Sequence, residues 1–364
     1  MSAAGISSLG FVDISGDAGS HVVVARGTQR DWQGHPNTLL LPDGRTMFCV
    51  WQARRDGTSK HGAPCGPLKR SDDGGLTWSE LLDVPESWWR VAHGHPTIHR
   101  LTDREGNARI FVFARTQELR EMVQAMSSDE GRTWTEARPV GEIVYWTAPQ
   151  SIEPVSGGRR HLMWYERSEE GAGAPGAIWQ SASDDGGMTW GDSRAVVALE
   201  GGLLCEPAVV RSPDGARLLL LMRENAREPS FYALSDDEGE SWSEARALPR
   251  ALNGDRHDGV YAPDGRLVIV FRDRDEASPA CGHFVAWVGT WEDIPAGREG
   301  QYRVKLLHSH AKFDTGYPGI ELLPDGTIVA TTYVRYAPDE LHSVVSVRFR
   351  LEEMDRRLAA GAAI

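Results

Sequence analysis

The chain has neither a long apolar run nor a paired-cysteine pattern. Its 364 residues include no stretch apolar enough to span a bilayer, and residues 1–10 lack the basic segment followed by an apolar run that marks a secretory signal. The four cysteines are scattered without C-x-x-C spacing, which argues against disulfides and against a zinc site. We therefore expect a cytoplasmic protein with free thiols.

An excess of positive charge is also lacking. The chain has 39 Lys and Arg against 52 Asp and Glu, which gives a formal net charge of −13. A nucleic acid or an anionic membrane would not be attracted to the average surface of such a protein, so we expect neither as a partner. The sequence also has no His pair at i,i+4 on a helix and no matching carboxylate spacing, and we predict no metal and no other cofactor.

Turn-forming and aromatic residues are abundant. Thirteen Trp, 39 Gly and 20 Pro suit many short strands and tight turns better than a helical bundle. A chain of 364 residues can bury a large core, and one repeat domain would use almost all of it. No second domain is needed.

One short motif, S-x-D-x-G-x-[TS]-W, occurs four times. The copies begin at Ser71, Ser127, Ser183 and Ser235, a spacing of 56, 56 and 52 residues. Self-similarity at a period of about 50 residues is typical of a radial or stacked repeat. Within the motif, Asp and Ser can bond to nearby backbone, Gly supplies positive φ, and Trp can anchor the turn between adjoining sheets. We expect four hairpin turns, and we expect their tryptophans to be buried between neighbouring strands: Trp78, Trp134, Trp190 and Trp242.

A second repeat lies between these motifs. Six segments have the pattern of an inner strand, a turn and another strand, and they begin near residues 35, 95, 149, 206, 257 and 317. Continuous apolar runs such as residues 218–221 are typical of buried strands. We predict an all-β, six-bladed propeller that occupies residues 1–364 as a single domain. Residues 21–25 and 343–349 would pair to close the ring, and residues 352–360 would form a short terminal helix.

The hairpins also predict a site. Residues equidistant from the turn of an antiparallel hairpin face one another. By this count Glu206 faces Arg223 and His257 faces Arg272. If all six inner hairpins point the same way, their ends form one polar rim around the axis, made of His35, His95, Glu206, His257, Tyr317, Arg54, Arg115, Arg167, Arg223, Arg272 and Arg335.

Arginines dominate this predicted rim. A guanidinium binds carboxylate, sulfate or phosphate at two points, so the expected ligand is a small molecule that carries an anionic group. Two structural alternatives stay open at this stage. Arginines at strand ends often pair with neighbouring acids, here Glu166, Glu224, Asp273 or Asp275, and a lone histidine is more often a structural residue than a catalyst.

The four repeated motifs resemble the Asp-box, or bacterial neuraminidase repeat, of the sialidase superfamily, whose members are six-bladed β-propellers. Sialidases use three arginines for the substrate carboxylate, a Tyr nucleophile activated by a Glu, and an Asp as general acid and base. The segment Glu206-Pro207 with Arg223 is similar to the one that supplies the family's Glu and second arginine. The segment around Tyr317-Pro318 is similar to the family's tyrosine segment.

The match to the family's catalytic residues is incomplete. Arg272 would be the third arginine, but the first-blade motif, Arg-Ile-Pro in the family, reads Gly34-His35-Pro36 here, so the first arginine is missing. The loop that should present the Asp, residues 59–64, contains none and offers Lys60 or His61 instead, with Asp56 the only nearby acid.

The resemblance implies a sialidase-like exo-glycosidase acting on a terminal acidic sugar. Tyr317 would be the nucleophile, Glu206 would take its proton, and His61 would protonate the leaving group. The substrate-binding residues would be Arg223, Arg272, His35, Arg54, His95, Arg115, His257 and Arg335.

Two other functions, and one further site, fit the same residues. In a lyase, a His or Tyr would take the proton α to a uronate carboxylate while arginines stabilise the enolate. A non-catalytic carbohydrate-binding propeller would keep the repeated motifs, because they are structural. A metal also stays open if His35, His61, His95 and His257 converge on the axis.

Overall fold

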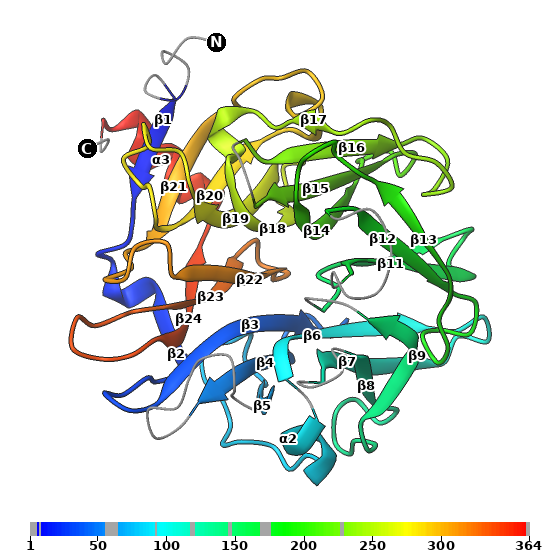
Figure 1. Cartoon of the computed structure of the whole chain (residues 1–364). Helices are drawn as coiled ribbons and strands as arrows, with labels where there is room; N and C mark the ends of the chain where they lie inside the picture. The colour runs from blue at the N-terminus through cyan, green and yellow to red at the C-terminus, as the bar shows by residue number, and fades with distance from the viewer. Residues whose placement is uncertain are drawn as a thin grey trace.

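Six β-sheets surround a central axis in the computed structural model of this chain (Figure 1). The structure describes residues 6, 9–54, 65–91, 93–116, 121–144, 148–167, 176–225 and 229–361. The first three sheets, or blades, consist of β3 (Trp32–Leu40), β4 (Met47–Arg54) and β5 (Cys65–Ser71); β6 (His93–Thr102), β7 (Ala108–Arg115), β8 (Glu121–Ser127) and β9 (Arg138–Val144); and β10 (Ile152–Val155), β11 (Arg160–Glu166), β12 (Ile178–Ser183) and β13 (Gly191–Val197).

The other three blades complete the ring. They consist of β14 (Leu204–Arg211), β15 (Leu218–Glu224), β16 (Phe231–Ser235) and β17 (Arg246–Ala247); β18 (Gly254–Tyr261), β19 (Leu267–Asp273), β20 (Phe284–Gly289) and β21 (Tyr302–Leu307); and β22 (Thr315–Leu322), β23 (Ile328–Val334) and β24 (Ser343–Phe349). Strands β3, β6, β14, β18 and β22 lie nearest the centre in Figure 1. The predicted six-bladed propeller is confirmed.

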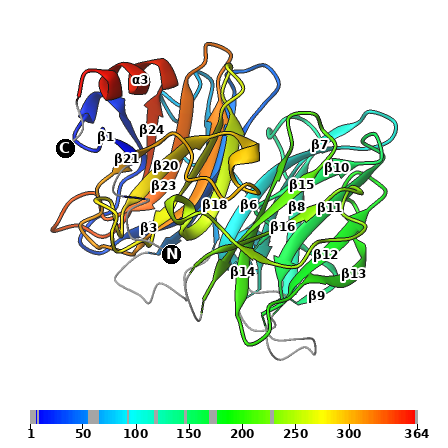
Figure 2. The same cartoon turned by 90° about the horizontal axis from the view of Figure 1, so that it is seen from above.

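The two ends of the chain close the ring. Strand β2 (His21–Ala25) pairs antiparallel with β24 and completes the sixth blade, as predicted. Strand β1 (Gly10–Asp13) pairs parallel with β21 in the fifth blade, which the sequence did not predict. The N-terminal segment therefore joins the last two blades. The predicted terminal helix is α3 (Leu351–Ala359), and it lies beside β1 at the outer edge (Figure 2).

The remaining helices are short. Within the described ranges they include α2 (Glu86–Val91) and the 3-10 turns η1 (Ala18–Ser20), η3 (Arg250–Leu252) and η4 (Trp291–Asp293). No helix in the described ranges is long and apolar enough to cross a membrane. Among the cysteines whose side chains are described, Cys49, Cys205 and Cys281 are free thiols.

The repeated motifs form tight turns between the outer strands, held by one Ser and one Asp. In the first copy, Asp73 Oδ1 accepts the backbone N–H groups of Leu76 and Thr77 at 3.0 and 2.9 Å, and Ser71 Oγ accepts the N–H of Gly75 at 2.8 Å. The bonds equivalent to those of Thr77 and Gly75 recur in the other three copies. The motif is therefore a turn whose backbone donors are satisfied locally.

The tryptophan of each motif joins its blade to the preceding blade. Trp134 packs against Phe48, with ring centroids 6.5 Å apart, and Trp190 packs in the same way against Phe113 at 6.1 Å. Trp190 is buried, but Trp78, Trp134 and Trp242 are half-buried, so the prediction of four buried tryptophans was wrong for three.

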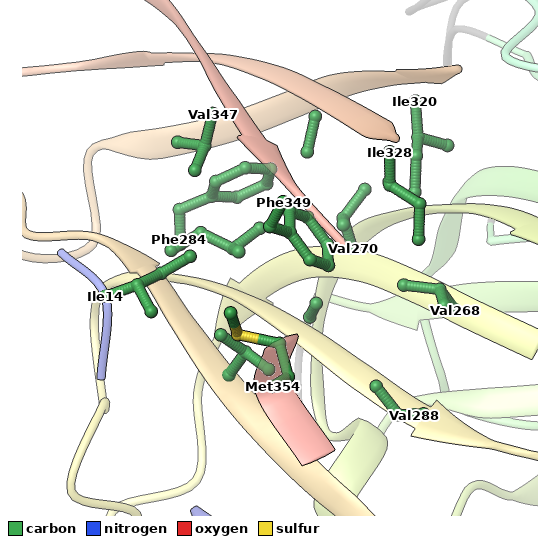
Figure 3. Packing of buried hydrophobic residues seen from close by; sticks show 14 of the residues in the cluster. Ile14, Val268, Val270, Phe284, Val288, Ile320, Ile328, Val347, Phe349 and Met354 are labelled. Carbon is green, nitrogen blue, oxygen red and sulfur yellow. The ribbon is translucent and has the colours of Figure 1, made fainter. Parts of the chain in front are cut away.

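The apolar core lies between the blades. Between the fifth and sixth blades it contains Val270, Phe284, Val347 and Phe349, and Met354 of α3 closes its outer end (Figure 3). Fully burying one such side chain stabilises the folded state by roughly 1.5 to 3 kcal/mol relative to leaving it exposed. The interblade core thus holds the inner strands in place, and these strands position the candidate site.

Candidate active site

Five inner strands carry a bulge near their first residue, and one residue of each bulge has a left-handed backbone. The φ angles are 50° at His35, 47° at His95, 51° at Glu206, 54° at Arg256 and 52° at Tyr317. A left-handed conformation costs a non-glycine residue roughly 1 to 2 kcal/mol, so the surrounding structure must impose it. Bulges of this kind re-aim a side chain next to active sites. All five residues come from strand ends that meet at the axis.

The bulges correct the predicted hairpin register. Arg223 lies opposite Cys205 rather than Glu206, and Arg272 lies opposite Asp255 rather than His257. The prediction failed because the bulge inserts one extra residue into the first strand of each hairpin, so that positions counted from the turn no longer match. In the fifth blade the turn adds a second error, because Tyr261 pairs with Leu267 and the turn is therefore centred on Asp264 rather than between Asp264 and Gly265. Glu206 nevertheless reaches Arg223 from within its bulge.

Tyr317 and Glu206 form the centre of the site. The Tyr317 hydroxyl donates a hydrogen bond of 2.5 Å to Glu206 Oε1, which also accepts Arg223 Nη1 at 3.0 Å. Burial opposes ionisation of Glu206, but the charges of Arg223 and Arg256 outweigh it and lower the pKa of the carboxyl. Burial and the Glu206 charge together raise the pKa of Tyr317 well above its usual value. The pair is therefore a neutral phenol that donates to a carboxylate.

A buried carboxylate, Asp255, gathers the neighbouring arginines. Its Oδ1 lies 2.8 Å from Arg223 Nε and accepts Arg274 Nη1 at 3.1 Å, while its Oδ2 accepts Arg272 Nε at 2.7 Å. Arg272 makes further hydrogen bonds, since its Nη1 donates to the carbonyls of Phe313 and Thr315. Burial alone would lower the pKa of Arg272, but the Asp255 carboxylate raises it. The predicted pair of anion-binding arginines is thus assembled around an internal carboxylate.

Two residues cover the ring of Tyr317. His95 stacks on it with centroids 4.5 Å apart and an interplanar angle of 14°. The guanidinium carbon of Arg256 lies 4.9 Å from the same centroid, a distance at which a cation is attracted to an aromatic ring. Both groups restrict the directions in which the phenol can move.

His257 does not lie where the sequence placed it. It is fully buried, its Nε2 lies 2.9 Å from the carbonyl oxygen of Leu252, and its ring packs on Phe271. Burial lowers its pKa. Arg256 occupies the bulge position that the sequence assigned to His257, and the substrate-binding role of His257 stays a prediction.

His35 lies against the same aromatic group. Its ring centroid is 4.2 Å from that of His95 and 4.5 Å from that of Tyr317, and its Nδ1 lies 2.8 Å from Gln52 Oε1. The two predicted histidines and the tyrosine thus come together, in agreement with a rim made by different blades.

The remaining predicted residues have different surroundings. Arg54 and Arg115 end their strands opposite Trp32 and His93, and their binding role stays a prediction. Arg335 donates to the carbonyls of Glu340 and Pro338 at 3.1 and 2.6 Å, so it supports its own loop. His61, the predicted acid, lies outside the described residues.

Sequence reasoning missed Arg256 although a signal was present. In three other blades the bulge residue precedes a Pro-Asp-Gly turn by seven positions: His35 before Pro42, Glu206 before Pro213, and Tyr317 before Pro324. Seven positions before Pro263 is Arg256, whereas His257 is only six before it. No comparable signal marked Asp255, because its partners are brought together only by the fold.

The three axial histidines that the structure describes, His35, His95 and His257, do not form a recognisable metal centre. In the part of the chain that the structure describes, no group of three or more His, Cys, Asp or Glu side chains is placed to hold a metal ion. His35 and His95 instead contact one another and Tyr317 through their rings.

Comparisons with known proteins agree with the repeats and the fold. Residues 170–328 match a family described as a BNR repeat-like domain. A search of curated proteins found no match. Among solved structures, a protein of unknown function from Dyadobacter fermentans is similar over 90% of this chain and 97% of its own, with a TM-score of 0.71 and 17% identity.

Two similar structures are sialidases by name. A mutant of the NanB sialidase from Streptococcus pneumoniae has a TM-score of 0.61 and 13% identity, covering 92% of this chain and 71% of its own. The intramolecular trans-sialidase from Ruminococcus gnavus has a TM-score of 0.60 and 16% identity, covering 92% of this chain and 98% of its own. At these identities the structural likeness concerns the fold. The fold and the BNR repeat-like match over residues 170–328 are what these comparisons establish for this chain.

Proposed function

We propose that this protein is a sialidase-like exo-glycosidase that releases a terminal acidic sugar, with Tyr317 as nucleophile and Glu206 as its base. The observation that carries the proposal is the 2.5 Å hydrogen bond from the buried Tyr317 hydroxyl to Glu206 Oε1. A nucleophile in hydrogen-bond contact with an oriented base is the arrangement that covalent catalysis requires. Arg223 orients the base in turn, because its Nη1 donates to the same oxygen.

The proposed step balances its charges within this site. Glu206 takes the phenolic proton as Tyr317 Oη attacks the anomeric carbon, and the bond from that carbon to the leaving oxygen breaks. The leaving oxygen takes a proton from an acid, for which His61 is our candidate. Water then attacks the anomeric carbon and gives a proton back to the acid, the bond from that carbon to Tyr317 Oη breaks, and Glu206 returns its proton to the phenol. A neutral phenol suits an anomeric carbon that lies beside a carboxylate, because the approach involves no repulsion between two anions.

The same residues support an anionic substrate group. In the described contacts, Arg223 uses Nε and Nη1 for Asp255 and Glu206, which leaves Nη2 for a ligand. Its side chain is 20% exposed. Arg272, by contrast, is bonded through all three of its nitrogens. We therefore assign direct anion binding to Arg223 and a supporting role to Arg272.

A substrate screen tests the proposal. Purified protein is incubated with oligosaccharides that end in different acidic sugars, and both the released sugar and the absorbance of new C=C bonds are followed. Release of a free acidic sugar, lost in Tyr317→Phe, would support the glycosidase. An unsaturated product would assign the site to a lyase, and saturable binding without turnover would assign it to a carbohydrate-binding propeller.

A further inference from the structure

A cavity of about 230 Å³ lies at the axis, lined by residues of five inner strands or the segments beside them. Gln150 stands between this cavity and the candidate active site. It lines the cavity together with Asp258 and Glu321, yet its side chain also contacts Arg256, the cation over the Tyr317 ring. Gln150 precedes β10 in the third blade, so it reaches across the axis to the fifth and sixth blades.

Gln150 makes three side-chain hydrogen bonds. Its Oε1 accepts Arg256 Nε at 3.0 Å, and its Nε2 donates to Asp258 Oδ2 at 2.7 Å and to the carbonyl oxygen of Pro318 at 3.0 Å. Only 6% of Gln150 is exposed. Arg256 is held a second time by the third blade, because its Nη2 donates to the carbonyl of Ala148 at 3.1 Å.

These partners fix the orientation of the amide. A guanidinium can only donate and a backbone carbonyl can only accept, so the amide oxygen must face Arg256 and the amide nitrogen must face Pro318. Rotating the amide by half a turn would place two donors together and two acceptors together, in a site almost closed to water. Glutamine therefore connects Arg256 with the backbone immediately after Tyr317 in one defined geometry.

We propose that Gln150 is a positioning residue for the reaction, which holds the Arg256 guanidinium over Tyr317 and beside Glu206. This inference rests on the function proposed above, because it assigns Gln150 a role at that same site. The charge of Arg256 helps to keep Glu206 ionised, so it supports the form that accepts the phenolic proton. A displaced Arg256 would leave Glu206 a poorer acceptor below neutral pH and would leave the tyrosine ring less constrained.

The decisive variant is Gln150→Met, which keeps the length of the side chain and removes all three hydrogen bonds. Gln180→Met is the matched control. Gln180 is 4% exposed and also makes three hydrogen bonds, to the indoles of Trp164 and Trp242 and to the carbonyl of Gly239, at the outer part of the third blade. Both variants lose buried bonds, but only Gln150 contacts Arg256.

Two measurements separate positioning from stability. In Gln150→Met we expect kcat to fall by roughly 10- to 100-fold with KM changed less than about threefold, because a small misplacement lowers the rate more than binding. We also expect the acidic limb of the kcat/KM profile to move to higher pH, since displacement of the Arg256 cation raises the pKa of Glu206. Gln180→Met should lower Tm and leave kcat and the pH profile unchanged.

A readout without substrate keeps the two proposals distinguishable. The titration of Glu206 can be followed by NMR in protein labelled with ¹³C at the glutamate carboxyl carbon, with the signal assigned through Glu206→Gln. We expect its midpoint to move to higher pH in Gln150→Met and not in Gln180→Met. If Gln150→Met does not fold, Gln150→Asn, too short to reach Arg256 and Pro318 together, should show the same shift. An unchanged midpoint would overturn the positioning role, whereas absence of glycosidase activity in the wild type would overturn only the proposed function.

Discussion

The Tyr317 hydroxyl donates its hydrogen bond to the carboxylate of Glu206 although the two residues are 111 positions apart in the chain. Both lie at the left-handed position of a bulge, Glu206 in the fourth blade and Tyr317 in the sixth. The same type of bulge, present in both blades, therefore brings two different side chains into contact. Because each bulge belongs to its own blade, a propeller can exchange one rim residue without altering the others.

Tyr317→Phe tests the nucleophile. We expect turnover on a terminal acidic sugar to fall by at least about a hundredfold, because the phenyl ring keeps the packing but has no oxygen to attack. The Tm should change little, since His95 and Arg256 contact the ring and not the hydroxyl. Steady-state kinetics and a thermal melt on the same samples decide the matter. Full activity in Tyr317→Phe would contradict the assignment.

Arg223→Lys tests the anion-binding site. Lysine keeps the charge but loses the planar fork, so we expect binding of the acidic sugar to weaken by roughly 1 to 3 kcal/mol, about 5- to 150-fold in Kd. Calorimetric titration of the product sugar measures this directly. Arg335→Lys serves as the control, because Arg335 bonds to carbonyls of its own loop. Equal effects of the two substitutions would mean that Arg223 contributes only charge.

Glu321→Gln tests the acidic groups of the axial cavity. Burial and the neighbouring Asp258 raise the pKa of Glu321 to about 8. Between its unfolded pKa and this value the folded state binds the extra proton, so the free energy of unfolding falls as pH rises. Glutamine removes that dependence. Because Glu321 is partly exposed to the cavity, we expect the free energy of unfolding of Glu321→Gln to exceed that of the wild type by on the order of 1 kcal/mol at pH 8.5 and to equal it at pH 4. Urea unfolding at the two pH values measures both differences. A gain of equal size at both pH values would show that ionisation is not its cause.

The fold could be predicted from the sequence because its signals are local. The turn of each repeated motif is held by hydrogen bonds between residues at most four positions apart, as those of Asp73 show. Such a turn can therefore be recognised from a short stretch of sequence. The closing pair of β2 with β24 followed from the need to cover sheet edges. The parallel addition of β1 to β21 had no such signal, because its four residues lack a distinctive pattern.

The site could be predicted only in part because it depends on backbone register. Tyr317, Glu206 and Arg223 were found from their motifs, and the structure brings them into contact. His257 was chosen in place of Arg256 because the turn was centred between Asp264 and Gly265, whereas the pairing of Tyr261 with Leu267 centres it on Asp264. An error of one residue reverses the direction of a strand side chain. Asp255 bonds to arginines from neighbouring strands and gives no sign of this in the sequence.

The last prediction concerns a glycine of the repeated motif. Gly131 has a φ of +80°, and a Cβ there would lie 2.4 Å from Cζ of the buried Phe48 in the preceding blade. Gly215, at the turn between β14 and β15, has a φ of +77° but nothing within 4 Å of a Cβ. Alanine at either position adopts an unfavourable backbone, whereas only Gly131→Ala must also displace the ring that packs against Trp134.

We therefore expect Gly215→Ala to lower the free energy of unfolding by about 1 kcal/mol and Gly131→Ala by roughly 2 to 4 kcal/mol. Urea unfolding of the two variants beside the wild type measures the difference, and an unchanged m-value shows that the transition stays comparable. Because Phe48 belongs to the first blade and Gly131 to the second, an excess loss in Gly131→Ala would show that the motif's glycine holds blades together as well as forming its own turn. Equal losses in the free energy of unfolding would mean that Phe48 can move away from the new Cβ without destabilising the protein. The motif's glycine would then serve only the turn within its own blade.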